Sequence, residues 1–150
     1  MVASTPSPTG ALVPPFQPRR LGKYRLLAPL AEGGMARVFI AQRDGATEVC
    51  VLKQLFENFA DNPIAVSRFL REAHVSSLLV HPRIGRVIDA GYEDGSFCIV
   101  MDLIVGKDIE SVMHALMRQK LMAPYPVSLT AIVGVLQALE FAHNAKDVRG

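Results

Sequence analysis

The sequence holds little that points to metal or nucleic-acid chemistry. Only two of its 150 residues are cysteines, Cys50 and Cys98, and they match no metal-ligand spacing, so we expect free thiols in a reducing compartment. The four histidines form no H-E-x-x-H or similar pair, and we assign no metal site. The formal net charge of +2 is too small to indicate a nucleic-acid partner.

Signals for export and for membrane insertion are also missing. The first ten residues, MVASTPSPTG, lack the basic start and apolar segment of a secretory signal. The apolar stretch FCIVMDLIV near the middle is short and is interrupted by Asp102. We therefore predict no membrane segment and expect a cytoplasmic protein.

What the chain does have is enough apolar sequence for a real core. Half of its residues are hydrophobic, which at this length predicts one domain, or one lobe and part of another. Residues 1–20 carry five of the ten prolines with Ser and Thr between them, so we predict a disordered arm there. Order is expected from about Leu21.

The pattern beyond the arm predicts three strands, a helix, two strands and then helices only. Asn62 and Pro63 are suited to begin the first long helix, and two further amphipathic helices follow Gly106. The expected strands are 24–30, 37–43, 47–55, 85–92 and 97–103, and the expected helices are 64–80, 109–121 and 128–144.

One stretch between the first two strands, LAEGGMARVF at residues 30–39, has two possible interpretations. The adjacent Gly33 and Gly34 would serve any β-hairpin, because glycine reaches positive φ without steric cost. A glycine loop can equally lie close against a phosphate. The stretch alone does not decide between the two.

Two charged residues further along bear on that choice. Lys53 lies in the third strand with the same side-chain parity as Val49 and Val51, and Glu72 follows 19 positions later in the helix, near Phe69. A lone lysine or glutamate is most often a solvated charge. A lysine pointing into a half-buried cleft, however, needs a carboxylate or a phosphate nearby.

Five motifs, in order and at matching spacing, resemble the protein kinase family, in particular its bacterial Ser/Thr branch. They are the glycine loop G-x-G-x-x-G-x-V at 31–38, V-A-I-K at 50–53, the helical-glutamate segment RFLREA at 68–73, HPRI at 81–84 and the hinge-like IVMDLIVGKDI at 99–109. The resemblance covers about residues 21–145.

The resemblance implies an ATP site. Backbone N–H groups of the glycine loop (Ala31, Gly33, Gly34 and Ala36) would cover the phosphates, and Lys53, paired with Glu72, would hold the α- and β-phosphates. The remaining implied contacts surround the nucleoside: Val38 and Val51 above the adenine, Met101 at the back, the Asp102 carbonyl and Ile104 backbone at its edge, and Asp108 at the ribose. Asp108 could instead cap the following helix.

The implied fold class is α+β. A kinase-like small lobe, with a five-stranded antiparallel sheet and one helix, is followed by the first two helices of a truncated helical C-lobe. The corresponding divisions are a 1–20 arm, a 21–106 N-lobe and hinge, and a 107–150 start of the C-lobe. The implied partners are ATP and a protein substrate, with a possible dimer through the N-lobe.

Two departures from the family pattern matter. Ala31 and Ala36 replace the first and third loop glycines, and neither H-R-D-x-x-x-x-N nor D-F-G occurs in the chain. The catalytic base and the Mg²⁺ ligands are therefore expected only in the missing C-lobe, and the chain alone should be inactive. A kinase-like regulatory module without catalysis is the alternative function; a small-molecule phosphotransferase is disfavoured by the RFLREA and HPRI segments.

The replaced glycines also predict the loop's backbone. Alanine pays roughly 1 kcal/mol or more in the left-handed region. We therefore expect any positive φ in residues 30–39 at Gly33 or Gly34, with Ala31 and Ala36 in β or α space.

Overall fold

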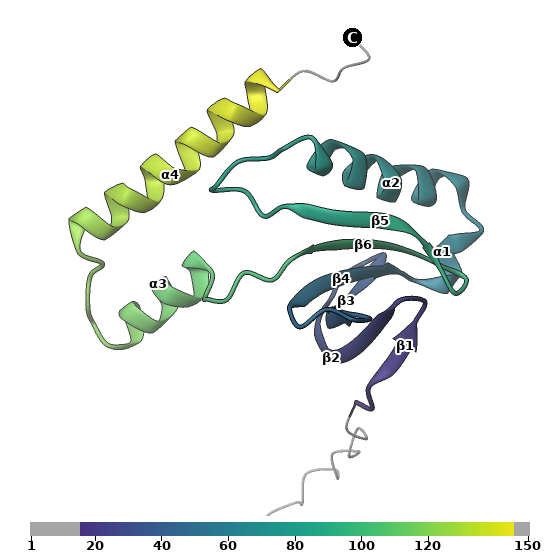
Figure 1. The fold of residues 1–150 in the computed structure, drawn as a ribbon. Coiled ribbons are helices and arrows are strands. Elements are labelled where there is room, and N and C mark those ends of the chain that lie inside the picture. The colour runs from purple at the N-terminus through teal and green to yellow at the C-terminus, as the bar shows by residue number, and fades with distance from the viewer. Residues whose placement is uncertain (1–15, 146–150) are drawn as a thin grey trace, which may run out of the picture.

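The computed structural model describes residues 16–145, which form one antiparallel sheet and four helices (Figure 1). The strands, in their order across the sheet, are β1 (Arg19–Leu21), β2 (Tyr24–Glu32), β3 (Ala36–Arg43), β4 (Val49–Leu55), β6 (Ser96–Asp102) and β5 (Val87–Glu93). The helices are α1 (Glu57–Ala60), α2 (Pro63–Ser77), α3 (Ile109–Arg118) and α4 (Tyr125–Asn144). The five predicted strands are present, and the predicted α+β class with an antiparallel sheet is confirmed.

The sheet has a sixth strand, β1, inside the segment that we predicted to be a disordered arm. Arg19 and Arg20 pair with Leu26 and Arg25 of β2, so the arm boundary at residue 20 is wrong. Gly22, at φ +53°, makes the tight β1–β2 turn possible, since a side chain would be strained there. Residues 1–15 of the predicted arm, and 146–150 at the other end, lie outside the described residues.

The sheet carries a core on each face. Alternate residues of a strand point to opposite faces, so each strand contributes to both. One core contains Leu21, Tyr24, Leu26, Phe39, Ala41, Cys50, Leu52, Cys98 and Val100, with Phe16 packed against it. The other contains Ala36, Leu55, Phe69, Ala73 and Ile99. Phe69 and Ala73 belong to α2, which therefore covers part of the second face (Figure 1).

Helix α2 begins as its sequence predicts. Asn62 is the N-cap, and its Oδ1 accepts hydrogen bonds from the N–H groups of Ile64 at 3.0 Å and Ala65 at 3.1 Å. Pro63 occupies the first turn, where its missing N–H costs nothing. The preceding helix, α1, was not predicted, because four residues are too few to show a periodic pattern.

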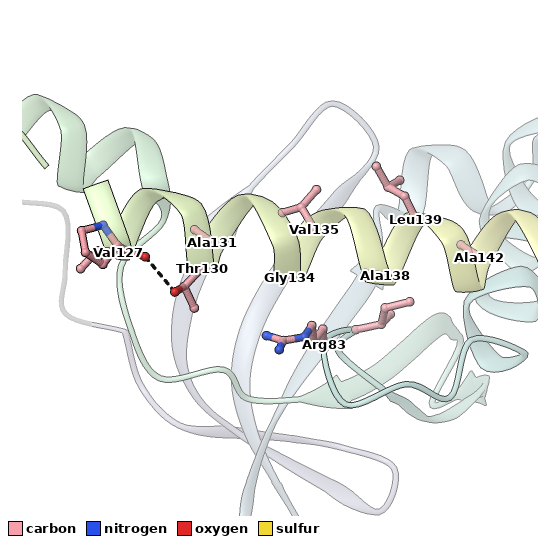
Figure 2. Close-up of a pocket in the computed structure, with 11 residues that line it drawn as sticks. Arg83, Val127, Thr130, Ala131, Gly134, Val135, Ala138, Leu139 and Ala142 are labelled. Atoms are coloured by element: carbon pink, nitrogen blue, oxygen red, sulfur yellow. Dashed lines mark hydrogen bonds between the residues drawn. The ribbon is translucent and has the colours of Figure 1, made fainter. Parts of the chain in front are cut away.

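Helices α3 and α4 lie beyond the end of β6 (Figure 1). Helix α4 starts at Tyr125, earlier than predicted, because Pro126 fits into a first helical turn rather than breaking it. The loop between α2 and β5 lies against α4: His81 stacks on Phe141 with 5.0 Å between ring centroids. Figure 2 shows Arg83 of the same loop beneath α4 at Gly134, where an added Cβ would come within 3.0 Å of the guanidinium.

Among the described residues, α4 alone is long and apolar enough to cross a membrane, by length and composition only. Its mean hydropathy is 1.4, and most of its apolar side chains are exposed. The core helix of a soluble protein passes the same test, so this finding does not assign a membrane span. The apolar stretch FCIVMDLIV lies in β6 and the segment after it, separate from α4, and the absence of a membrane segment stays a prediction.

Candidate functional site

Lys53 lies in the middle of the sheet, on the face that α2 partly covers. In the strand register it is opposite Val38 of β3 and Ile99 of β6, and side chains directly opposite each other share a face. Its ammonium lies 5.7 Å from the centre of the Phe69 ring. The lysine side chain is only 22% exposed, so its charge needs a partner.

Glu72 of α2 supplies that partner. Its Oε1 accepts from Lys53 Nζ at 2.6 Å, which confirms the predicted approach of the two groups. The glutamate is half exposed, so the pair lies at the edge of the core and can be reached by solvent. Phe69, one turn earlier on the helix and fully buried, anchors α2 on the sheet and so sets the position of Glu72.

The glycine loop connects β2 and β3 beside this pair. The pairing of β2 with β3 ends at Glu32 and Arg37, and beyond it the Gly33 N–H donates to the Ala36 carbonyl at 2.9 Å. Ala31 and Ala36 lie outside the left-handed region, as predicted. Gly33 and Gly34 also lie outside the left-handed region, so no residue of 30–39 has the positive φ that was expected, if anywhere, at these two glycines.

The tip of the loop is open. Strand β2 ends at Glu32 and β3 begins at Ala36, and the hydrogen bond from the Gly33 N–H to the Ala36 carbonyl closes the chain around Gly34 and Met35. The two glycines have no side chains, and a Cβ added at Gly34 would meet no atom within 4 Å.

The apolar residues assigned to the adenine share the Lys53 face. Val51 lies two positions before Lys53 in β4 and pairs with Met101 of β6. Val38 of β3, opposite Lys53, is diagonal to Val51. Val51 is buried, while Val38 and Met101 are partly exposed. Together they form an apolar surface next to the ion pair, of the kind that a nucleotide base can stack against.

The remaining predicted residues lie at the end of β6 and in the segment that follows it. Asp102 ends β6, its N–H donates to the Arg86 carbonyl at 3.0 Å, and Ile104 is 74% exposed. Asp108 caps α3, accepting from the Ser111 N–H at 2.6 Å and from its Oγ at 2.8 Å. These hydrogen bonds hold the pKa of Asp108 below its usual value, and the bond from the Ser111 backbone N–H has the larger effect. The capping interpretation of Asp108 is thus observed.

A second cluster, away from this face, was missed by the sequence analysis. Tyr24 donates its O–H to Asp89 at 2.8 Å, and Lys23 contacts Asp89 at 2.8 Å and Glu93 at 3.2 Å. Burial raises the pKa of Tyr24, and the Lys23 ammonium lowers the pKa of Asp89. The cluster ties β2 to β5, at the other edge of the sheet. No local pattern signals it, because Tyr24 and Asp89 are 65 positions apart.

A kinase-type small lobe, with a glycine loop beside a strand lysine that is paired to a helical glutamate, is the class that this fold and site define. The protein kinase domain family model matches residues 24–148, and the chain belongs to the protein kinase family. Among described residues, no group of three His, Cys, Asp or Glu side chains could hold a metal ion.

Curated bacterial kinases are similar over most of the chain. Tyrosine-protein kinase MasK of Myxococcus xanthus is 32% identical over 148 residues, 97% of this chain and 23% of that protein. Serine/threonine-protein kinase pkn3 of the same organism is 36% identical over 128 residues, 82% of this chain and 22% of that protein. The chain therefore spans less than a quarter of the length of these relatives.

Solved kinase domains are also similar to this chain over only part of their length. The crystal structure of the Mycobacterium tuberculosis PknI kinase domain superposes with a TM-score of 0.63 and 30% identity. The alignment covers 83% of this chain and 50% of that domain. The structure thus corresponds to about half of a kinase domain.

Proposed function

We propose that this chain is the N-terminal part of a Ser/Thr protein kinase, which binds ATP and transfers its γ-phosphoryl group to protein hydroxyls. The observation that carries the proposal is the 2.6 Å ion pair between Lys53 and Glu72, set beside the glycine loop. The pair joins β4 to α2, and in the family such a pair is required for phosphoryl transfer. Bacterial Ser/Thr kinases among the relatives support the choice of hydroxyl.

In this proposal, the described residues bind and orient the nucleotide. Lys53 donates to the α- and β-phosphates while Glu72 holds the ammonium in place. Val38, Val51 and Met101 contact the adenine, whose edge bonds to the Asp102 carbonyl and the Ile104 backbone. The loop at Ala31, Gly33, Gly34 and Ala36 covers the phosphates. Bound ATP supplies the group that is transferred.

We further propose that the chain alone transfers no phosphate. The family places its catalytic base and Mg²⁺ ligands in H-R-D and D-F-G motifs, and neither motif occurs in the sequence. The groove between α4 and the loop at Arg83 and Ile84 is lined mainly by apolar side chains (Figure 2). This is a surface that the other half of a kinase domain would cover.

Activity of the complete coding sequence tests the proposal. We expect transfer of labelled γ-phosphate to a protein substrate or to the kinase itself, and a loss of at least roughly 100-fold in Lys53→Met, because the phosphate contact is removed. Lys120→Met, at an exposed lysine after α3 and outside the site, is the matched control and should keep full activity. Full activity in Lys53→Met would remove Lys53 from the site.

The same experiment separates the alternatives. Phosphoamino-acid analysis distinguishes Ser/Thr from tyrosine transfer, which matters because MasK is named a tyrosine-protein kinase. ATP binding without transfer would instead assign a kinase-like regulatory module. We also propose a cytoplasmic location and no nucleic-acid partner; a dimer through the N-lobe remains a prediction, which sedimentation of the complete protein would check.

A further inference from the structure

The side chain of Arg37, in β3, contacts β2 at Glu32 and the segment after β4 at Phe56. It pairs directly with Glu32 in the register of β2 and β3, and its Nε donates to Glu32 Oε2 at 2.8 Å. Its guanidinium lies over the ring of Phe56, 5.5 Å from the ring centre, within the range of a cation–π contact. Phe56 directly follows β4, the strand that carries Lys53.

The backbone reinforces this connection at the same residue. The Phe56 N–H donates to the carbonyl of Met35 at the tip of the loop, at 3.0 Å. The Met35 side chain packs against the core that contains Phe69 and Ile99. The loop tip is thus held against the end of β4 by a hydrogen bond, and Arg37 stacks on the residue that donates it.

Arg37 cannot itself reach a ligand beside Lys53. It pairs with Gln54 in the register of β3 and β4, whereas its neighbour Val38 pairs with Lys53. Successive residues of a strand point to opposite faces, so Arg37 lies on the face away from Lys53. Any effect of Arg37 on ligand binding must therefore pass through the position of the loop.

We propose that Arg37 is a positioning residue, which through Glu32 and Phe56 holds the glycine loop in place over the Lys53 site. The proposal rests on the ATP site of the proposed function. An exposed ion pair contributes little by itself. Here the ion pair, the ring contact and the backbone hydrogen bond all fix the same short loop. The conformational entropy lost in ordering this loop is therefore offset by three contacts together. A loop ordered in advance binds its ligand more tightly.

We call Arg37 with Glu32 and Phe56 the clamp. Hydrogen exchange in the chain without nucleotide tests directly whether the clamp holds the loop. In Arg37→Leu we expect the amides of Gly33 and Phe56 to exchange about 3- to 10-fold faster, the range that an exposed ion pair plus a cation–π contact supports. Arg25→Leu is the matched control: Arg25 is at the far end of the hairpin, where it donates to Gln42 at 3.0 Å. It should leave both amides unchanged.

Two further variants keep the proposal falsifiable if Arg37→Leu disturbs folding. The charge swap Glu32→Arg with Arg37→Glu rebuilds the ion pair without the ring contact, so it should restore protection at Gly33 and not at Phe56. Arg37→Lys keeps the charge and loses the planar stacking, and should fall between wild type and Arg37→Leu. Unchanged exchange at both amides in all three variants would overturn the proposal.

The affinity for ATP links the clamp to the site. We expect Arg37→Leu to raise the Kd for ATP about 3- to 10-fold, mainly through faster dissociation. An unchanged Kd, with a loosened loop, would overturn the proposed effect on binding. The wild-type chain could bind no ATP while Arg37→Leu still speeds exchange at Gly33 and Phe56. The proposed function would then fail, whereas the role of Arg37 in holding the loop would stand.

Discussion

At the scale of single residues, the site depends on where one lysine can place its charge. Lys53 points to a face made of Val38, Val51 and Phe69, where an unpaired ammonium would be costly. Glu72 offsets that cost because its Oε1 accepts a hydrogen bond from Lys53 Nζ at 2.6 Å. Its side chain remains half exposed, which leaves solvent and ligands access to the pair. The pair thus satisfies a half-buried charge and stays accessible from solvent.

Ala36 offers a prediction at this scale. It is 4% exposed and packs with Leu55 and Phe69, so Ala36→Gly removes a buried methyl group and frees the unfolded chain. We expect a loss of about 1–2 kcal/mol of unfolding free energy, measured by urea denaturation.

The matched control is Gly34→Ala. Its Cβ would meet no atom within 4 Å, and its backbone lies outside the left-handed region. We expect a gain of about 0.4–1 kcal/mol, because the unfolded chain loses freedom. A more stable Ala36→Gly protein would contradict the description of the loop.

At the scale of elements, the sheet's edges are joined by charges. Asp89 of β5 accepts from Tyr24 of β2, and Lys23 reaches both Asp89 and Glu93. The Gly22 N–H in the β1–β2 turn also donates to Asp94, at 2.6 Å. Strands β2 and β5 are not neighbours in the sheet, so these contacts fix its curvature.

The contacts of Asp89 with Tyr24 and Lys23 predict that the free energy of unfolding depends on pH. The pKa of Asp89 is lower in the folded state, so its contribution is present above the unfolded value of about 3.9 and is lost as pH falls through the folded value. Asp89→Asn should lose about 1 kcal/mol at pH 7, after allowance for solvent screening, and should show a flatter fall in stability below about pH 4.

Chemical denaturation at several pH values checks this expectation. Asp61→Asn, at an exposed carboxylate after α1, is the control and should keep the acid dependence of the wild type. Equal slopes for Asp89→Asn and the wild type between about pH 2 and 4 would show that Asp89 is not responsible.

The elements also show which features a sequence can predict. The long strands and α2 follow from local pattern, and Asn62 marks the start of α2 as expected. Strand β1 has three residues and α1 has four, which is too short for any periodic signal. The Lys53–Glu72 pair followed from a family resemblance, whereas the contact of Arg37 with Phe56 depends on how a turn meets the end of another strand.

At the scale of the whole molecule, the chain corresponds to half of a kinase domain. The residues proposed to bind the nucleotide lie in β2 to β6 and the segment after β6, while α4 keeps many apolar side chains exposed. If the proposed function holds, the chain carries the residues that bind a nucleotide, without those that the family uses for the chemistry. Binding and transfer should be separable in this protein.

The most direct test of the central claim is a map of backbone amide shifts during titration of the 150-residue chain with ATP. We predict shifts at the glycine loop, at Val51 and Lys53, and from Met101 to Ile104, and predict their loss in Lys53→Met. The opposite sheet face, at Cys50 and Cys98, should stay unchanged. Saturable shifts confined to that opposite face, or none at millimolar ATP, would contradict the account.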